Sequence, residues 1–406
     1  MKTKIIAMLA FMLVLAAVDT ATLTQNTAFG QRARVIVRGS RRGVGAVYVN
    51  NNAVSGNAVT IFSRESNGTL TREGAVSTGG RGTGNILESQ GTLILSEGNE
   101  WLFAANPGSD DISIFAVVEG SGLILLDRVP SGGDRPLSLT VCEDLLYVLN
   151  AGSEGNITGF HIGPDGRLTQ IPGSTRQLST TASEPCPPLV VDLGDPGAIC
   201  SAAGPGQIQF NPNGDVLVVT ERLTNGTGLI DTYTVGDDGR TTGFTTRPPA
   251  DGLSPFGFDF AKRNLLVVTH NFFDGPGLGA AASYRVLEDD SVATVTPNLP
   301  NGQSASCWTI ITNNGRYAYI TNPISATVSS YSIARDGGLS LLSPVAANLS
   351  GRDPRDPALS DNGRFLYVLN NLTATVSAFV VRGDGGLTFL GDVSGFPSGA
   401  VGLAAR

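Results

Sequence analysis

A repeated three-part phrase constrains the fold of this chain more than any other feature. Residues 365–370, 374–379 and 385–390 read Phe-Leu-Tyr-Val-Leu-Asn, Ala-Thr-Val-Ser-Ala-Phe and Gly-Gly-Leu-Thr-Phe-Leu, and residues 317–342 repeat the same order. The middle part ends in an aromatic residue that recurs about every 50 residues, which identifies a repeat architecture. The seven copies of this aromatic residue are Phe62, Phe115, Phe160, Tyr233, Tyr284, Tyr331 and Phe379.

Each copy divides into short strands separated by tight turns. Asp-Gly or Asn-Gly pairs follow the aromatic strand in five copies and precede the Leu-Tyr-Val-type strand in three. Such pairs supply the positive φ angles that hairpin turns require. One more strand lies upstream, so each copy is a four-stranded meander, with strands named a to d in chain order. Seven such units predict an all-β, seven-bladed β-propeller, whereas a β-solenoid, the alternative, has shorter repeats and parallel strands.

The two ends of the repeat array complement each other. The first copy begins with a b-type strand at residues 45–50, and residues 397–404 after the last copy match an a strand. We therefore expect the C-terminal strand to complete the first blade and close the ring, which leaves no open sheet edge. The predicted organisation is a signal peptide and leader at residues 1–30, a basic N-terminal arm at 31–44 and the propeller at 45–406.

The N-terminal residues have the pattern of a secretory signal peptide. Lys2 and Lys4 precede an apolar run at residues 5–18, which is too short for a comfortable membrane span. We expect an exported protein, periplasmic or extracellular, that has no membrane span and is a monomer. The net charge is −8 and basic residues cluster only at residues 32–42, which we interpret as a solvated leader; this pattern excludes nucleic acid as a partner.

The four cysteines fall into two groups. Cys186 and Cys200 lie in one stretch rich in Pro and Gly, and export would permit a disulfide between them. Cys142 and Cys307 lie in strand-like segments and are expected to be buried thiols. No Cys-x-x-Cys motif or Cys/His ligand spacing occurs, so we expect no metal site.

With these motifs the chain resembles the seven-bladed lactonase-like propellers, which include the propeller-type 6-phosphogluconolactonases and the carboxymuconate-lactonizing enzymes. The resemblance rests on repeats of Asn-Gly-Arg-(Phe/Tyr)-x-Tyr-(Val/Ile)-x-Asn, Thr-Val-Ser-x-(Phe/Tyr) and Asp-Gly-Gly-Leu, over about residues 45–405. It implies a propeller fold and a lactonase-type activity. Enzymes of the family tend to carry His after Pro at the start of the innermost strands; here Leu137, Phe256 and Arg355 follow those prolines.

Long insertions gather on one face of the predicted ring. In each blade the a–b and c–d turns lie on one face, and the b–c and d–a loops lie on the other. The first set is uniformly short, so we interpret that face, the tight-turn face, as structural. The long insertions at residues 180–206, 222–229 and 271–280 all belong to the second set. Insertions on one face mark the binding face of a repeat protein, which we call the insertion face.

The residue that ends strand b departs from the repeat in two neighbouring copies. Five copies carry Asn there, which we assign to Asn50, Asn106, Asn150, Asn322 and Asn370. The fourth and fifth copies carry Glu221 and His270, expected at the rim of the insertion face. A carboxylate and an imidazole there could act as a general acid/base pair. A histidine pKa of about 6.5 would give activity a limb between about pH 5 and 8. Ordinary surface variation is the alternative.

Other candidate residues lie near the starts of the innermost strands. An Arg there could hold a carboxylate or phosphate group by paired hydrogen bonds, although neighbouring Arg and Asp side chains could pair with each other instead. A Trp could line an apolar wall or belong to the core. The candidate substrate-binding residues are Arg135, Gln207, Gln303, Trp308, Arg355 and Asp356.

Two functions are consistent with the sequence. The first is a lactonase-like enzyme that opens or closes the lactone ring of a sugar acid or organic acid. Arg355 or Arg135 would bind the acid group, and Glu221 or His270 would move the proton, without a metal or organic cofactor. The second is a non-catalytic propeller that binds a protein or glycan through its insertion face. Convergent Arg, Glu and His side chains in the central funnel would favour the enzyme.

Overall fold

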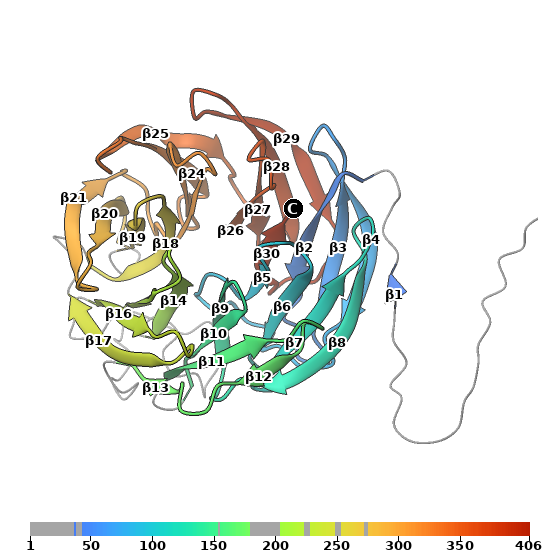
Figure 1. The fold of residues 1–406 in the computed structure, drawn as a ribbon. Coiled ribbons are helices and arrows are strands. Elements are labelled where there is room, and N and C mark those ends of the chain that lie inside the picture. The colour runs from blue at the N-terminus through green and yellow to red at the C-terminus, as the bar shows by residue number, and fades with distance from the viewer. Residues whose placement is uncertain are drawn as a thin grey trace, which may run out of the picture. The chain divides into compact units, whose positions relative to one another are not determined.

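Seven antiparallel sheets arranged as a ring form the body of the protein in the computed structural model (Figure 1). The structure describes residues 36–37, 43–152, 155–178, 204–222, 228–247, 253–271 and 275–406, which belong to one compact unit, Val35–Arg406. The predicted signal peptide and the predicted Cys186–Cys200 disulfide lie outside the described residues. Every described element is a strand, and a membrane-crossing helix is not found in the described ranges.

Each sheet is one blade, and its strands run a, b, c, d outward from the ring centre. The first blade contains β30 (Val401–Ala405), β2 (Gly45–Asn50), β3 (Ala58–Arg64) and β4 (Leu70–Ser77). The second contains β5 (Leu93–Leu95), β6 (Trp101–Asn106), β7 (Asp111–Val117) and β8 (Leu123–Pro130). The third contains β9 (Pro136–Cys142), β10 (Leu145–Asn150), β11 (Asn156–Ile162), β12 (Leu168–Gln170) and the short β13 (Arg176–Gln177).

The remaining four blades follow the same order without a change of topology. The fourth contains β14 (Pro205–Phe210), β15 (Val216–Glu221), β16 (Leu229–Val235) and β17 (Thr241–Arg247). The fifth contains β18 (Pro255–Ala261), β19 (Leu265–His270), β20 (Ala280–Val286) and β21 (Val292–Pro300). The sixth contains β22 (Trp308–Ile311), β23 (Tyr317–Asn322), β24 (Thr327–Ile333) and β25 (Leu339–Asn348). The seventh contains β26 (Pro354–Leu359), β27 (Phe365–Asn370), β28 (Thr375–Val381) and β29 (Leu387–Ser394).

The C-terminal strand closes the ring as predicted. β30 pairs antiparallel with β2, from Val47 opposite Ala405 to Asn50 opposite Val401. Figure 1 shows β30 between the innermost strands β26 and β5, and both of these contact it. The first blade is therefore assembled from the two ends of the repeat array, and the last blade has a neighbour on each side.

The segment expected to be a solvated N-terminal arm contains a strand. Ile36–Val37 forms β1, which pairs antiparallel with β8 at the outer edge of the second blade. The outermost strand of a blade has unpaired backbone groups on its outer side, and any extended residues nearby can bond to them. The strand covers two residues only, so the local sequence carried little signal for it.

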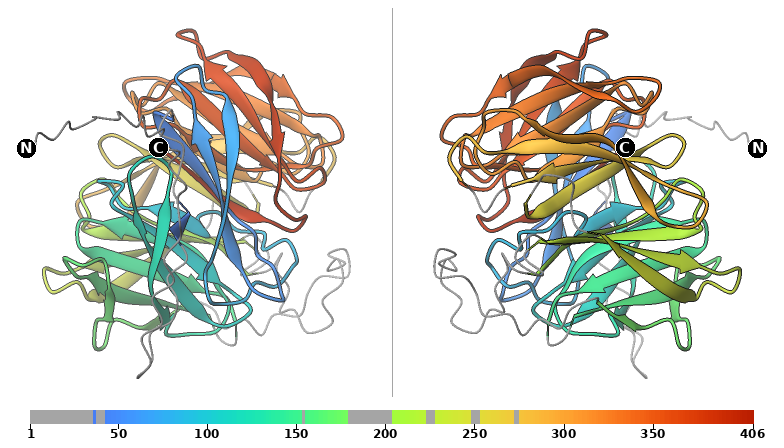
Figure 2. Two further views of the ribbon diagram at one scale, coloured as in Figure 1. Left: turned by 90° about the vertical axis from the view of Figure 1, so that its right-hand side faces the viewer. Right: turned by 90° about the vertical axis from the view of Figure 1, so that its left-hand side faces the viewer.

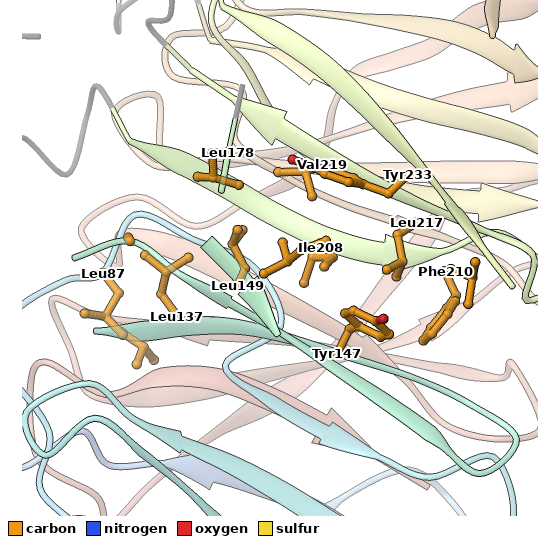
Figure 3. Packing of buried hydrophobic residues seen from close by; sticks show 14 residues of the cluster. Leu87, Leu137, Tyr147, Leu149, Leu178, Ile208, Phe210, Leu217, Val219 and Tyr233 are labelled. Atoms are coloured by element: carbon orange, nitrogen blue, oxygen red, sulfur yellow. The ribbon is translucent and has the colours of Figure 1, made fainter. Parts of the chain in front are cut away.

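The core lies between neighbouring blades, and the seven repeated aromatic residues are all buried in it. Figure 3 shows one such layer, in which Tyr147 and Leu149 of the third blade meet Leu217, Val219 and Tyr233 of the fourth. Successive side chains of a strand point to opposite faces of its sheet, so both faces of a blade pack against a neighbour. The side views in Figure 2 show the blades as separate twisted sheets around the ring.

The predicted Asn-Gly and Asp-Gly turns adopt the left-handed conformation. Gly68, in the c–d turn of the first blade, has φ of +89°. A Cβ atom on it would lie 2.2 Å from the ring of Phe365 in the seventh blade. A Cβ atom on Gly385 in the seventh blade would likewise lie 2.5 Å from the ring of Tyr317 in the sixth. Glycine is thus required both by the turn and by the contact between blades.

Candidate functional site

The end of strand b lies on the insertion face, and the strand register corrects one of its assigned residues. In the second blade, Asn106 lies four residues after the strand b residue that pairs with the aromatic Phe115. The same count from the residue that pairs with Phe62 gives Asn51 in the first blade, not Asn50. Both side chains hydrogen-bond to a hydroxyl of strand c, at 2.8 Å for Asn51 and 2.7 Å for Asn106. The repeated Asn therefore ties the end of strand b to strand c.

Glu221 occupies this position in the fourth blade and is buried. It follows Leu217 and Val219 on the same face of β15, the face that packs against the third blade. Tyr233 lies near it in the same layer. Burial raises the pKa of Tyr233, and the charges of Asp231 and Glu221 raise it further. Two acidic residues thus share this layer with a tyrosine.

His270 occupies the same position in the fifth blade and is fully buried. Its Nδ1 lies 3.3 Å from Oδ1 of Asn298, and its Nε2 lies 3.3 Å from the hydroxyl of Tyr284. Burial lowers the pKa of His270 to about 4. The imidazole is therefore neutral near pH 7, and an activity limb between about pH 5 and 8 would not come from it.

The structure places these two residues in different layers of the propeller. Glu221 belongs to the layer between the third and fourth blades, whereas His270 shares the face of Val268 in the layer between the fourth and fifth. The sheet of the fourth blade lies between the two layers. The expected acid/base pair is therefore not assembled on one surface.

A different group of side chains converges at the ring centre, on the insertion face. Arg355 lies at the start of β26 and is buried. Its Nη1 donates to Oε1 of Glu88 at 2.8 Å, and its Nε donates to Oδ2 of Asp353 at 3.0 Å. The start of an innermost strand is the position where the sequence predicted a funnel residue, and Arg355 occupies it.

Aromatic rings connect Arg355 to a second buried arginine. The Arg355 guanidinium lies 5.2 Å from the ring centre of Trp308, and that of Arg222 lies 4.9 Å from the ring centre of Phe256. The two rings meet edge to face, with centres 5.0 Å apart. Nη1 of Arg222 lies 4.0 Å from Oε2 of Glu88. Two cation–π contacts and one carboxylate thus close a loop of five side chains, which we call the central cluster.

The charges of the central cluster keep its groups ionised. Burial raises the pKa of Glu88, but Arg355 and Arg222 outweigh burial and hold that pKa below its ordinary value. Burial lowers the pKa of Arg355, but Glu88 and Asp353 outweigh it and raise that pKa overall. The Glu88 side chain is 27% exposed, against 9% for Arg355 and 2% for Arg222. Glu88 is the member of this ion-paired trio that solvent reaches best.

Residues 87–91, here called the central segment, carry Glu88 into the ring centre. The Ser89 carbonyl accepts a hydrogen bond from Nε1 of Trp308 at 2.8 Å. The Gln90 amide pairs with Thr309, donating to its carbonyl at 2.7 Å and accepting from its N–H at 3.0 Å. The hydroxyl of Ser138 donates to the Gln90 carbonyl at 2.6 Å. A loop between the first two blades is thereby bonded to innermost strands of the third and sixth.

Two further predicted residues lie near the centre but are engaged with backbone. Gln207 is buried and bridges β14 to β18, because its amide donates to the Phe258 carbonyl and accepts from the Phe258 N–H, both at 2.8 Å. Asp356 is buried beside Arg355. Burial raises the pKa of Asp356 to about 7, although the N–H of Gly402 opposes that shift.

The other two predicted binding residues are held in loops outside the central cluster. The Arg135 N–H donates to Oδ1 of Asp110 at 2.7 Å, which anchors the turn before β9. Oε1 of Gln303 accepts from the Thr327 hydroxyl at 2.9 Å, at the start of β24. Of the six predicted binding residues, Arg355 and Trp308 belong to the central cluster.

Sequence reasoning missed Glu88, Arg222 and Asp353 as site residues. Arg222 directly follows Glu221, so its position after strand b on the insertion face was a usable signal. Glu88 carries no such signal, because only the path of the loop brings it to the centre; its φ of +48° reflects that path. No group of three His, Cys, Asp or Glu side chains placed to hold a metal ion occurs within the described ranges.

Fold and central cluster together define a seven-bladed β-propeller with a charged, aromatic-walled centre on its insertion face. A family model described as "Lactonase, 7-bladed beta-propeller" matches residues 44–183. The resemblance to the lactonase-like propellers is thereby confirmed. No curated protein matches the chain.

Solved structures with this fold cover most of the chain. A "putative 6-phosphogluconolactonase" from Bacteroides fragilis is 18% identical with a TM-score of 0.67, covering 89% of this chain and 98% of its own. A periplasmic gluconolactonase from Pseudomonas aeruginosa is 16% identical with a TM-score of 0.66, covering 88% and 98%. At these identities the likeness establishes the shared fold.

Proposed function

We propose that this protein is a lactonase that opens the lactone ring of a sugar acid or organic acid at the central cluster. The observation that supports this most directly is the carboxylate of Glu88 between two buried guanidinium groups, beside the aromatic wall of Phe256 and Trp308. Lactone opening needs a water held for attack and a cationic environment for the oxyanion that forms. The central cluster has a carboxylate that can hold the water and two guanidinium groups that supply the positive charge. A protein of the same fold is described as a gluconolactonase.

The side chains divide these tasks by exposure. Glu88, the most exposed, accepts a hydrogen bond from the attacking water and takes up its proton, which passes to the ring oxygen when the bond between that oxygen and the carbonyl carbon breaks. Arg355 and Arg222 oppose the negative charge that develops on the carbonyl oxygen, and their burial strengthens that interaction. Asp353 holds Arg355 at its Nε, 3.0 Å away, and is a positioning residue.

The pH profile distinguishes the two carboxyl groups near the cluster. Because the arginines lower the pKa of Glu88, a reaction that depends on it loses activity only below the ordinary Glu value of about 4.3. Burial raises the pKa of Asp356 to about 7, so a reaction that depends on Asp356 has a limb near neutrality instead. We expect the first profile.

The test is hydrolysis of 6-phosphogluconolactone, glucono-lactone and muconolactone, followed as acid release. Glu88→Gln and Arg355→Gln should each reduce kcat/KM by on the order of 100-fold, the effect of losing a group that stabilises the transition state. The matched control is Arg352→Gln, which removes a guanidinium from the Asp392 ion pair in the same blade and should leave kcat/KM unchanged. If both variants still hydrolyse the lactones, the catalytic site lies elsewhere.

Glu221 and His270, although they lie in different layers, are the competing catalytic candidates at strand ends on the insertion face. Glu221→Gln and His270→Ala should leave turnover within about twofold if the central cluster is the site. Loss of activity in these two variants, with Glu88→Gln active, would support the strand-end pair. Folding of each variant is checked by circular dichroism, because both residues are buried.

A binding module is the second candidate, favoured by the central segment. That segment fills the ring centre and bonds to innermost strands of other blades. In this case the insertion face binds a protein or glycan, and no lactone is turned over. Two results together would favour the binding module. The wild-type protein would hydrolyse none of the three lactones, and it would bind a glycan array in a way that substitution at the insertion face abolishes.

We also infer that the protein is exported. The support is the charged start and the apolar run at residues 5–18. The test is expression of the full chain in a bacterial host, with cell fractionation and N-terminal sequencing of the product. A product that retains residues 1–20 in the cytoplasmic fraction would overturn this inference.

A further inference from the structure

A second candidate site lies on the tight-turn face, opposite the insertion face. A cavity of about 740 Å³ opens between the fifth and sixth blades. Its walls come from the a–b turns of both blades, the c–d turn of the sixth blade and the end of β20. The short turns of this face predicted a structural role for it. Short turns nonetheless leave a hollow where two blades diverge.

The cavity is lined by five cationic side chains and no acidic one. They are Lys262, Arg263, Arg285, Arg316 and Arg335. Among the described residues, none of the five lies within 4.0 Å of a carboxylate. Asp336 follows the last of them in sequence, but its Oδ1 accepts from the N–H of Gly338 at 3.0 Å.

Backbone carbonyls hold part of this group in place. Nη1 of Arg285 donates to the Arg263 carbonyl at 2.6 Å, and its Nη2 donates to the Asp336 carbonyl at 2.8 Å. Nη2 of Arg263 donates to the Arg335 carbonyl. These bonds fix the two guanidinium groups without neutralising their charge. Binding a ligand would cost little side-chain entropy at Arg263 and Arg285, because these hydrogen bonds already position them.

The basic surface continues into the next interblade hollow. A second cavity of about 270 Å³, between the sixth and seventh blades, shares Asn314 and Arg316 with the first and adds Arg364 and Arg382. Arg382 pairs with Asp384 at 3.2 Å. Arg316 lies between the two cavities and rests 5.5 Å from the ring centre of Tyr317. It is the charged residue that lines both cavities.

This arrangement concentrates positive charge on one part of an otherwise acidic chain. The chain as a whole is acidic, with a net charge of −8 and 27 Lys and Arg residues against 35 Asp and Glu. Four of the five side chains are exposed to solvent, and an anion bound between them would offset their mutual repulsion. Guanidinium groups match oxyanions with paired hydrogen bonds. A cavity of this volume has the size of a small-molecule site.

We propose that the tight-turn face carries a binding site for a small molecule with two or more oxyanion groups. Phosphate and carboxylate groups share the required chemistry, and the experiment separates them. The site is independent of the central cluster and of the proposed lactonase activity, because it lies on the other face of the ring and shares no residue with it.

The test is isothermal titration calorimetry of the full-length protein with tripolyphosphate and, separately, with citrate at low ionic strength. At least one should bind, and raising the salt concentration should weaken binding. Arg316→Gln should raise the dissociation constant about tenfold, the loss of one charge-assisted hydrogen bond, and Lys262→Gln/Arg316→Gln should raise it further. Binding of tripolyphosphate alone identifies a phosphorylated ligand, and binding of citrate alone identifies a polycarboxylic acid.

The matched control is Arg81→Gln, which removes an exposed guanidinium from the insertion face. It changes the net charge as Arg316→Gln does and should leave the dissociation constant unchanged. Equal weakening in both variants would mean that the anion responds to overall charge, and that result overturns the proposal. Unchanged binding in the double variant, or binding of neither anion by the wild type, overturns it as well.

Discussion

The hydroxyl of Tyr367 in the seventh blade donates to the backbone carbonyl of Gly68 in the first blade, at 2.9 Å. Two sequential pairs of blades make the same contact, from Tyr147 to Gly239 at 2.6 Å and from Tyr319 to Gly385 at 3.0 Å. The interface that closes the ring therefore uses the same bond as interfaces within the array. Closure repeats an ordinary blade contact instead of adding a special one.

Tyr367→Phe should destabilise the protein by about 1–2 kcal/mol, because it leaves the buried Gly68 carbonyl without its donor. Tyr147→Phe removes the equivalent bond between the third and fourth blades and should cost a similar amount. Urea unfolding of both variants measures the two losses. A negligible effect at position 367 beside a clear one at 147 would contradict the equivalence of the closing interface.

Deleting residues 397–406 removes β30 and should destabilise the ring severely. Val401 and Leu403 are buried, and losing their burial alone costs on the order of 3–6 kcal/mol. The deletion also exposes the edge of β2, which favours association of chains. Thermal unfolding and size-exclusion chromatography measure both effects. Unchanged stability in a monodisperse sample would refute closure by strand exchange between the ends.

His270 should make the protein sensitive to acid. Its pKa is about 4 in the folded state and about 6.5 when unfolded, so the unfolded chain binds the proton first as pH falls. The neutral, buried histidine makes its full contribution to the free energy of unfolding above about pH 6.5. About 3 kcal/mol of that free energy is lost as pH falls towards 4.

His270→Asn restores the Asn of other blades and should remove this dependence. The control is His161→Asn, because His161 is half exposed in a strand c. Denaturant unfolding at about pH 4 and pH 7 gives the difference for each variant. Asp356, whose burial raises its pKa, titrates in the opposite direction, so the variants are compared with wild type at the same pH. Identical pH dependence in wild type and His270→Asn would contradict the prediction.

The Cys186–Cys200 disulfide remains a prediction from the sequence. In the chain-entropy description a loop of this length stabilises by about 3 kcal/mol. Peptide mapping of protein made in an oxidising compartment, without reduction, should recover both cysteines in one linked fragment. Alkylation of both thiols before reduction would rule the bond out.

The sequence predicted the fold well because repeated patterns carry it. The aromatic residue of strand c recurs in all seven copies and the Asn-Gly or Asp-Gly turns recur in several of them, so an error at one copy does not spread to the others. The assignment of Asn50 shows the limit: three consecutive asparagines, residues 50–52, stand at the end of strand b, and only the pairing with strand c selects Asn51. A shift of one residue reverses the face of a strand, so adjacent identical residues are the hardest to place.

The candidate site was harder to predict because it does not follow the repeat. Arg355 and Trp308 were found from their place at the start of innermost strands. Glu88 comes from a connecting loop, and its contact with Arg355 joins residues far apart in the chain. His270 and Glu221 were correctly placed at strand ends, but alternation along the strands sends each into a different layer. Loop paths and side-chain direction both depend on the assembled ring.

The pairing of β30 with β2 has a consequence for the order of folding. Val401 meets Asn50 across almost the whole chain. Loop closure over such a distance is entropically costly, and non-local pairing slows folding. During synthesis the first blade lacks its innermost strand until residue 405 has been added, so the earliest part of the propeller is the last to be completed. A ribosome-bound nascent chain that ends before residue 400 should therefore expose β2 to proteases and chaperones, even though six blades are already translated.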